Sequence, residues 1–91
     1  MRRPLLTTMR IFNDFPHALS AIAAVMERGA RTHQDEDWRA LPVGFHLARA
    51  RRHLDLLAGG DVSEPHLAHA ACRLLMELER DAQVGGGSPL G

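Results

Sequence analysis

The stretch LPVGFHLARARRHLDLLAGG, residues 41–60, decides the fold class of this 91-residue chain. Its apolar side chains repeat at steps of three and four residues, which is the period of one face of an α-helix. The repeat consists of Val43, Leu47, Ala50, Leu54 and Leu57. Pro42 precedes it and the pair Gly59-Gly60 ends it, which are typical start and stop signals. We therefore predict a helix between Pro42 and the glycine pair, with the repeat as its buried seam.

A second helix is predicted on the C-terminal side of this stretch. It begins around residues 63–65, because Ser63 can cap a helix and Pro65 suits a first turn. Its apolar stripe is made of Leu67, Ala71, Leu74 and Leu78, flanked by Ala68 and Leu75. We expect this helix to fray after Arg80.

A third helix is predicted on the N-terminal side. The run Asn13-Asp14-Phe15-Pro16 offers a capping residue and a proline near the first turn. The apolar stripe that follows is Leu19, Ile22, Ala23, Met26 and Ala30. Gly29, near the end of this helix, could let another backbone approach. A polar run then ends the pattern, so we expect a loop from about His33 to Pro42.

These patterns predict an all-α fold with three main helices, because no segment alternates with period two for long enough to form a sheet. We expect an N-terminal segment at residues 1–11, a helical domain at 12–82 and a flexible Gly-rich tail at 83–91. Roughly 70 residues are left to bury a core, a size at which a single domain is only marginally stable. We therefore expect a helical bundle completed by self-association, as a homodimer or a homotetramer.

The charge balance argues against a general nucleic-acid binder. Eleven arginines balance eleven acidic side chains, and the chain has no lysine. Affinity for nucleic acid comes from neutralising many phosphates, which a chain of zero net charge does poorly. The absence of lysine has two interpretations: biased codon usage, or a use of guanidinium groups that bind phosphate.

Cysteine usage and hydropathy indicate a cytoplasmic protein without a membrane partner. Cys72 is the only cysteine, which rules out an internal disulfide and fits a reducing compartment. It lies among small residues on the second predicted helix, which is typical of a buried thiol rather than a nucleophile. No apolar stretch approaches the length that spans a bilayer.

Two carboxylates and two imidazoles lie within the nine residues 61–69, DVSEPHLAH. They are Asp61, Glu64, His66 and His69. This set could hold Mg²⁺ or Mn²⁺, since both ions take carboxylates and histidine suits Mn²⁺ better. The alternative is structural: the two acids would favour the positive end of the following helix, and the histidines would be half-buried with ordinary hydrogen bonds.

Arginines and one tryptophan are candidates for nucleotide contacts. Arg49 or Arg52 could bind a phosphate through paired hydrogen bonds. Alternatively, the arginines of residues 49–52 form a solvated face or pair with the acidic side chains of the preceding loop. Trp38 is the only tryptophan; it could stack on a base or sugar, or fill a core or an interface.

The order of short motifs along the chain is similar to that of a known family. The motifs are Pro16-His-Ala18-Leu19, Val25, Gly29-Ala30, Asp37-Trp38, Arg52-His53-Leu54, Gly60-Asp61, Ser63-Glu64 and His66-Leu-Ala-His-Ala-Ala-Cys72. Over about residues 12–80 the chain resembles the phage dATP/dGTP diphosphohydrolases (MazZ-like), which belong to the all-α, MazG-like nucleotide pyrophosphohydrolases. The piece His-Leu-Ala-His-Ala, following Arg-His-Leu, is the most specific part of this resemblance.

The resemblance implies an activity and a set of roles. A member of this family would hydrolyse a deoxypurine triphosphate between its α and β phosphates, releasing a monophosphate and pyrophosphate with the help of Mg²⁺ or Mn²⁺. Glu64 and His53 would be the catalytic residues. The metal ligands would be Asp61, Glu64, His66 and His69. Arg52 and His53 would face the phosphates, and with the candidates noted above the residues in contact with the nucleotide would be Arg49, Arg52 and Trp38.

The sequence departs from the family's pattern on the first predicted helix. Where the family usually carries glutamates, this chain has Ser20 and Ala21. Glu27 lies about two turns further on and could substitute only if the helix were rotated. Fewer carboxylates would then hold cations against a triphosphate.

Two further hypotheses therefore stay open. The first is a degenerate family member that binds a nucleotide or a protein partner without hydrolysis. The second is a small helical DNA-binding regulator with residues 49–52 on a recognition helix, against which the zero net charge counts.

Overall fold

The computed structural model describes residues 4–32 and 37–84, and the regular elements in these ranges are all helical. They are α1 (Pro4–Asp14), α2 (Pro16–Thr32), the short 3-10 helix η1 (Trp38–Ala40), α3 (Phe45–Ala58) and α4 (His66–Val84). The predicted all-α fold is confirmed. We predicted three main helices, whereas the described ranges contain four α-helices.

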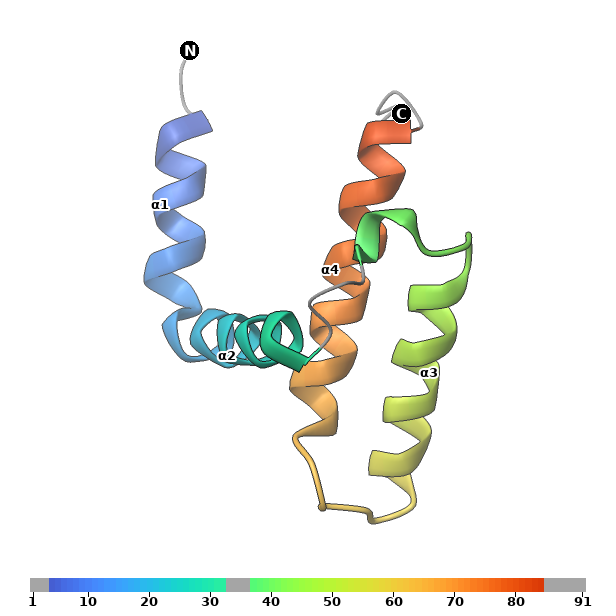
Figure 1. Ribbon diagram of the computed structural model, residues 1–91. Coiled ribbons are helices and arrows are strands. Elements are labelled where there is room, and N and C mark those ends of the chain that lie inside the picture. Colours follow the sequence, from blue (N-terminus) through green and yellow to red (C-terminus); the bar gives the residue numbers. More distant parts are fainter. Residues whose placement is uncertain (1–3, 33–36, 85–91) are drawn as a thin grey trace.

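The additional helix, α1, lies where we expected an N-terminal segment outside the helical domain. An α-helix needs no core to form its backbone hydrogen bonds, which are local, and Pro4 suits a first helical position. Met9, Ile11 and Phe12 of α1 are all exposed. Among the described elements, α1 contacts only α2 (Figure 1).

A change of chain direction separates α1 from α2 (Figure 1). The N–H of Phe15 still donates to the carbonyl of Ile11, at 3.0 Å. Pro16 has no N–H to continue the ladder, so one helix ends and the next begins, as predicted, at this proline. Leu19 then resumes the bonding by donating to the carbonyl of Phe15 at 3.0 Å.

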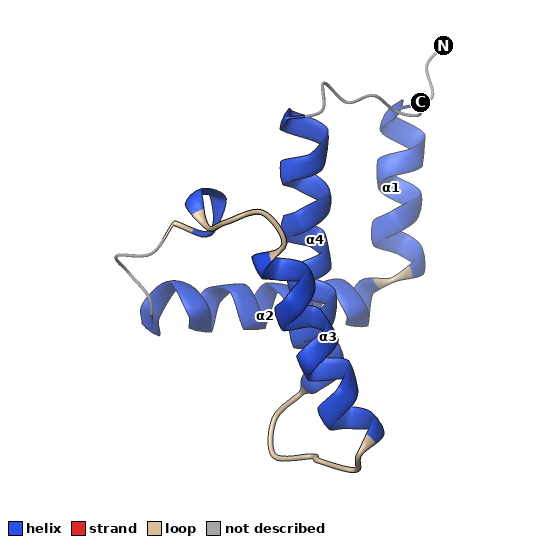
Figure 2. Ribbon diagram, turned by 90° about the vertical axis from the view of Figure 1, so that its right-hand side faces the viewer, coloured by secondary structure: helices blue, strands red, loops and turns tan. Residues whose placement is uncertain are grey.

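Helices α3 and α4 form an antiparallel hairpin, and α2 lies across α4 (Figures 1 and 2). The hairpin is the most extensive helix pairing in the described structure. The predicted loop between α2 and α3 contains η1, which packs against α4. This arrangement places one face of α4 between α3, α2 and η1.

Local signals explain the ends of the hairpin helices. Gly44, with φ +86°, turns the chain into α3 through a conformation that favours glycine. The glycine pair ends α3 as predicted, and Gly59 donates to the carbonyl of Asp55. Helix α4 does not fray after Arg80 but continues to Val84. The rest of the expected Gly-rich tail, residues 85–91, lies outside the described residues.

The interior of the hairpin is lined by small side chains and histidines. His46 and Ala50 of α3 and His66, Ala70 and Cys72 of α4 are each 2% exposed or less. Small side chains let two helices approach closely, and the imidazole rings fill the space between them. Buried rings of this kind are tolerated because their nitrogens are hydrogen-bonded.

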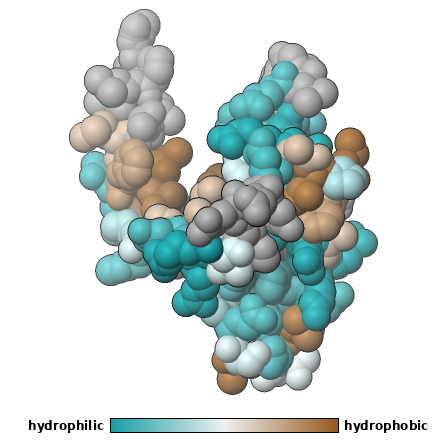
Figure 3. Space-filling view, viewed as in Figure 1, coloured by the Kyte–Doolittle hydropathy of each residue, from teal (hydrophilic) through white to brown (hydrophobic). Residues whose placement is uncertain are grey.

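The apolar seams that we predicted for these two helices are therefore wrong at their leucines, whereas Ala50 is buried as predicted. Leu47 and Leu54 of α3 are exposed, and Leu67 and Leu78 of α4 are 64% and 65% exposed. Both faces of each helix have the same period, so periodicity alone could not show which one packs inward. Figure 3 shows apolar surface (brown) over α1 and on the hairpin, interrupted by polar surface (teal).

None of the helices in the described ranges is long and apolar enough to cross a membrane.

Candidate functional site

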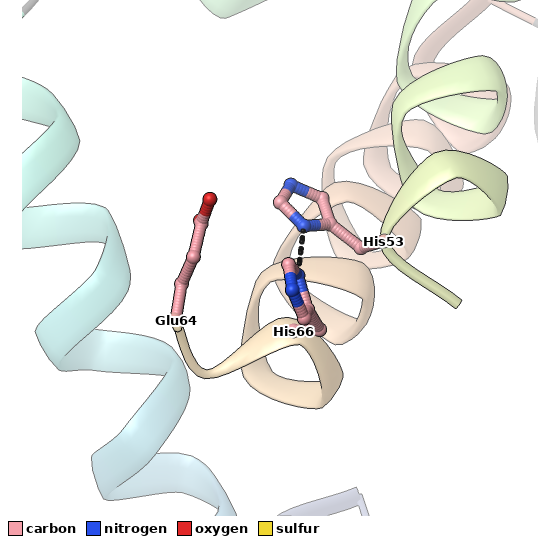
Figure 4. Close-up of side chains that lie close together, drawn as sticks. All are labelled: His53, Glu64 and His66. Carbon is pink, nitrogen blue, oxygen red and sulfur yellow. Dashed lines mark hydrogen bonds between the residues drawn. The ribbon is translucent and has the colours of Figure 1, made fainter. Parts of the chain in front are cut away.

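The α3–α4 hairpin brings together three potential metal ligands. His53 comes from α3, Glu64 from the connecting loop, and His66 is the first residue of α4. One nitrogen or oxygen atom of each lies within 4.8 Å of the others. Figure 4 shows the two imidazoles in contact and Glu64 on the side that faces α2.

A chain of hydrogen bonds determines which ring nitrogens in this group carry a proton. The Nδ1 atoms of His53 and His66 are 2.9 Å apart, and Nε2 of His66 lies 2.5 Å from Oδ2 of Asp61. The hydrogen bond from His66, followed by that from the Ser63 hydroxyl, lowers the pKa of Asp61. Asp61 is therefore a carboxylate that accepts, and His66 Nε2–H donates to it.

The same chain exposes a lone pair on His53. When His66 is neutral and its Nε2 carries the proton, its Nδ1 can only accept, so His53 Nδ1–H is the donor between the two rings. A neutral His53 then keeps a lone pair on Nε2. Burial, followed by the neighbouring His69, lowers the pKa of His53 and favours this neutral form.

His69 completes the cluster one turn along α4. Its ring stacks on that of His53, with centroids 4.8 Å apart and planes 13° apart. Its Nε2 lies 3.6 Å from Oε1 of Glu64. Burial lowers the pKa of His69, the Glu64 carboxylate opposes that shift, and Arg28 of α2 adds to it. Burial thus favours the neutral form of His69, which lies beside Glu64 and near enough to Arg28 of α2 for that side chain to affect its pKa.

The donor set fits a divalent cation that accepts both nitrogen and oxygen. Glu64 offers a carboxylate and His53 offers Nε2, whereas both nitrogens of His66 are already hydrogen-bonded. His66 would ligate an ion only by giving up its bond to His53. One carboxylate with imidazoles suits Mn²⁺ better than Mg²⁺, which prefers oxygen.

The predicted metal ligands take different places around this group. Glu64 and His66 belong to it, together with His53, for which we predicted a catalytic role. Asp61 lies behind His66 and orients its ring, as carboxylates do behind metal-bound histidines. His69 lies beside Glu64, outside the closest group.

A cavity of about 330 Å³ opens between α2, η1 and α4. Its walls are largely apolar, and its lining residues are Val25, Met26, Gly29, Ala30, Trp38, Leu41, His69, Cys72, Arg73 and Met76. His69 belongs both to this cavity and to the histidine cluster. The cavity and the potential metal ligands therefore form one continuous site.

A second hydrogen-bonded chain builds the polar wall of the cavity. An Nη1 group of Arg73 donates to Nδ1 of His46 at 3.0 Å. His46 therefore carries its proton on Nε2, which donates to the backbone carbonyl of Trp38 at 2.9 Å. Arg73 also lies over the ring of Phe45, at 5.6 Å from its centroid. These contacts hold α3, α4 and η1 together around the cavity.

Sequence reasoning missed Arg73 and His46. The available signal was spacing, because Arg73 lies four residues after His69 and so on the same face of α4. The contact between Arg73 and His46 joins residues 27 apart in the sequence, which no local pattern shows.

Of the residues predicted to contact the nucleotide, one lines the cavity and two lie outside it. Trp38 lines the cavity, and its ring is covered on one side by Arg39, at 4.4 Å. Arg49 is exposed and lies over the ring of Phe45, at 5.2 Å. Arg52 is exposed and lies near enough to His53 to affect its pKa. Neither Arg49 nor Arg52 lines the cavity.

The α2 positions that depart from the family's pattern lie on the surface. Ser20 and Ala21 are both exposed. Glu27, considered as a substitute carboxylate, is exposed and pairs with Arg31 at 3.8 Å. Glu64 is thus the one carboxylate in the group of potential metal ligands found among the described residues.

Comparisons with known proteins agree with the resemblance seen in the motifs. No curated protein and no solved structure matches the chain significantly. One family model does match, and it covers residues 3–87, nearly the whole chain. The chain therefore belongs to the family described as dATP/dGTP diphosphohydrolase, N-terminal.

Proposed function

We propose that this protein is a metal-dependent (deoxy)nucleoside triphosphate pyrophosphohydrolase that converts dATP or dGTP to the monophosphate and pyrophosphate. The observation that carries the proposal is the convergence of His53, Glu64 and His66 beside a cavity that shares His69 with them. The family's description names the same two nucleotides.

His53, Glu64 and His66 would hold the divalent cation, Mn²⁺ or Mg²⁺. When bound, the ion supplies Lewis acidity and lowers the pKa of a bound water. Glu64 has a side chain that is 46% exposed, so it can reach both the ion and solvent. Asp61 accepts from Nε2 of His66 and so leaves Nδ1 of that ring unprotonated, which is the nitrogen that would turn from His53 to the ion.

Positive side chains surround this end of the site and would bind the phosphates. Arg28 affects the pKa of His69, and Arg52 affects that of His53. Guanidinium groups suit phosphate because they donate paired hydrogen bonds. The role that we predicted for Arg52 is retained here, and Arg28 is added to it.

The direct test is pyrophosphate release from the four common dNTPs, with Mn²⁺ or Mg²⁺, by the wild type and Glu64→Gln. We expect metal-dependent release from the purine nucleotides, and a loss of more than about 100-fold in the variant, because even outer-shell partners of a metal are worth 10–100-fold. Glu79→Gln is the matched control, since Glu79 is an exposed carboxylate on α4. Undiminished turnover by Glu64→Gln would remove Glu64 from the mechanism.

One observation favours a second candidate, nucleotide binding without hydrolysis. The group of potential metal ligands contains a single carboxylate. One carboxylate offsets little of the charge of a divalent cation that must also bind a triphosphate. In that case a dNTP would bind with micromolar to millimolar affinity in calorimetry, and no metal would produce pyrophosphate.

We also propose that the protein associates with itself. Leu67, Leu74 and Leu78 of α4 and Leu47 and Leu54 of α3 are exposed apolar side chains. A second copy of the chain would bury them and complete the predicted bundle.

A further inference from the structure

We propose that the cavity between α2, η1 and α4 is the subsite for the purine base, with the Trp38 ring as its stacking surface and Arg73 as the donor that recognises the base. This inference rests on the proposed function, which it deepens by naming the part of the substrate that each end of the site binds.

The size and the walls of the cavity suit a nucleobase. Its volume of about 330 Å³ is at the small end of ligand pockets, enough for a base and sugar. Val25, Met26 and Met76 give it an apolar wall. Cys72 adds to this wall as a neutral thiol, because burial raises its pKa. A charged triphosphate would lose its hydration there, whereas a flat aromatic ring would gain apolar contact.

Arg73 is held in a fixed place on the polar wall. It donates to His46, whose other nitrogen donates to the carbonyl of Trp38. The stacking residue and the recognising residue are thus joined by one hydrogen-bonded chain. Such preorganisation reduces the entropy lost when a ligand binds.

A guanidinium group selects among bases because it has donors and no acceptor. Guanine presents two acceptors, O6 and N7, that arginine binds as a pair. On the edge that carries N7, adenine presents an amino donor beside that acceptor, so it offers arginine one acceptor instead of two. We therefore expect Arg73 to favour guanine over adenine, and the larger purine rings to stack on Trp38 more strongly than the single ring of cytosine.

The position of His69 explains why the occupant is a nucleotide. His69 lines the cavity and also lies 3.6 Å from Glu64 and in stacking contact with His53. A base held against Trp38 would leave its sugar and phosphates near this ring. The charged end of the molecule would then lie at the histidine and carboxylate group, where a cation would bind.

The chain carries its own reporter for this subsite. Trp38 is the only tryptophan and there is no tyrosine, so near-ultraviolet fluorescence comes from the cavity wall. Deoxyguanosine, deoxyadenosine and deoxycytidine, titrated in EDTA, test base binding without phosphates or metal. We expect quenching by both purine nucleosides, tightest for deoxyguanosine, and at least fivefold weaker binding of deoxycytidine.

Gly29 provides a way to close the cavity without disturbing the fold. We expected a neighbouring backbone to approach it, but a Cβ added there would meet nothing within 4 Å. Gly29→Leu therefore places a side chain in the open space of the cavity. We expect it to weaken deoxyguanosine binding at least tenfold, with an unchanged circular dichroism spectrum.

The matched control is Ala24→Leu, at an exposed position on the same helix that does not line the cavity. It should bind deoxyguanosine like the wild type. Arg73→Lys should keep the quenching but reduce the preference for guanine over adenine, because lysine lacks the paired donors.

Equal affinity for deoxyguanosine and deoxycytidine, or full binding by Gly29→Leu, would overturn the base subsite. No quenching by any nucleoside at millimolar concentration would overturn it as well, even if the protein releases pyrophosphate. Purine-selective quenching without pyrophosphate release from any dNTP would support the base subsite and reject the proposed hydrolysis.

Discussion

The two halves of α4 differ in whether their buried polar groups have hydrogen-bond partners. In the first half, His66 is buried and hydrogen-bonded through both ring nitrogens, and Arg73 donates to His46. In the second half, Oε1 of Glu77 and an Nη1 atom of Arg80 are buried, and neither has a hydrogen-bond partner in the part of the chain that is described. Buried polar atoms are nearly always satisfied in folded proteins. The buried polar groups of the first half are thus satisfied within one chain, whereas the described part of the chain leaves those two atoms of the second half unsatisfied. Exposed leucines lie on both halves, at Leu67, Leu74 and Leu78.

The largest expected difference between the two halves concerns folding stability. His66→Leu removes a buried ring that makes two hydrogen bonds, and it leaves His53 without an acceptor. We expect the free energy of unfolding to fall by about 1–3 kcal/mol. Glu77→Leu removes an atom that has no partner, so we expect little loss or a gain in the free energy of unfolding. Urea unfolding in EDTA measures both. An equal loss in the two variants would show that the halves do not differ.

A smaller effect is expected on self-association. Leu78 is 65% exposed and lies one residue from Glu77, so Leu78→Glu should weaken any contact that this half of α4 makes with a second copy. Sedimentation velocity over a range of concentrations should show an oligomer for the wild type and a single chain for the variant. Val62→Glu is the control, because Val62 is 85% exposed but lies in the loop before α4. A monomeric wild type at all concentrations would contradict the assignment of this surface.

The smallest expected effect is a pH dependence carried by the histidine cluster that packs against the first half of α4. Burial is the main cause that lowers the pKa of both His53 and His69 in the folded protein. Below the usual histidine pKa of about 6.5, the unfolded chain therefore binds protons that the folded chain does not, and stability falls as the pH falls. The fall continues until the pH reaches the folded pKa values. The pKa of Asp61 is lowered mainly by its hydrogen bond from His66. Asp61 therefore also makes the folded state less stable as the pH falls, but in a more acidic range, below about pH 4.

Thermal unfolding in EDTA between pH 7.5 and 5 tests this dependence. His69→Gln should flatten the curve, because it removes one of the two groups. His17→Gln, at an exposed position on α2, should leave the curve as it is in the wild type. A wild-type melting temperature that is constant over this range would show that the two rings titrate alike in the folded and unfolded chains.

The sequence by itself determined the helical class, the main helix boundaries and the family. Pro16 and the pair Gly59-Gly60 act through local backbone chemistry, so their effects could be predicted without knowing the fold. The sequence also singled out Glu64 and His66, which the structure places together as potential metal ligands, because they lie two residues apart on a loop and the helix that follows it. Metal binding by these residues stays a prediction. Helix α1 was missed because residues 1–11 were assigned to a segment outside the helical domain, whereas helix formation depends on local bonds.

Only the tertiary structure decided which helix faces are buried and which residues share the site. Leucine stripes and the alternative face of histidines and alanines repeat with the same period, and hydropathy favoured the leucines. The inward face keeps Ala50 from the predicted stripe but otherwise consists of residues such as Ala70, His46 and His66, and the two histidines are satisfied by hydrogen bonds across the helix pair. Those bonds join residues 13 and 27 positions apart, and only packing brings such distant groups together. For the same reason the cavity, and Arg73 within it, became visible only in the folded chain.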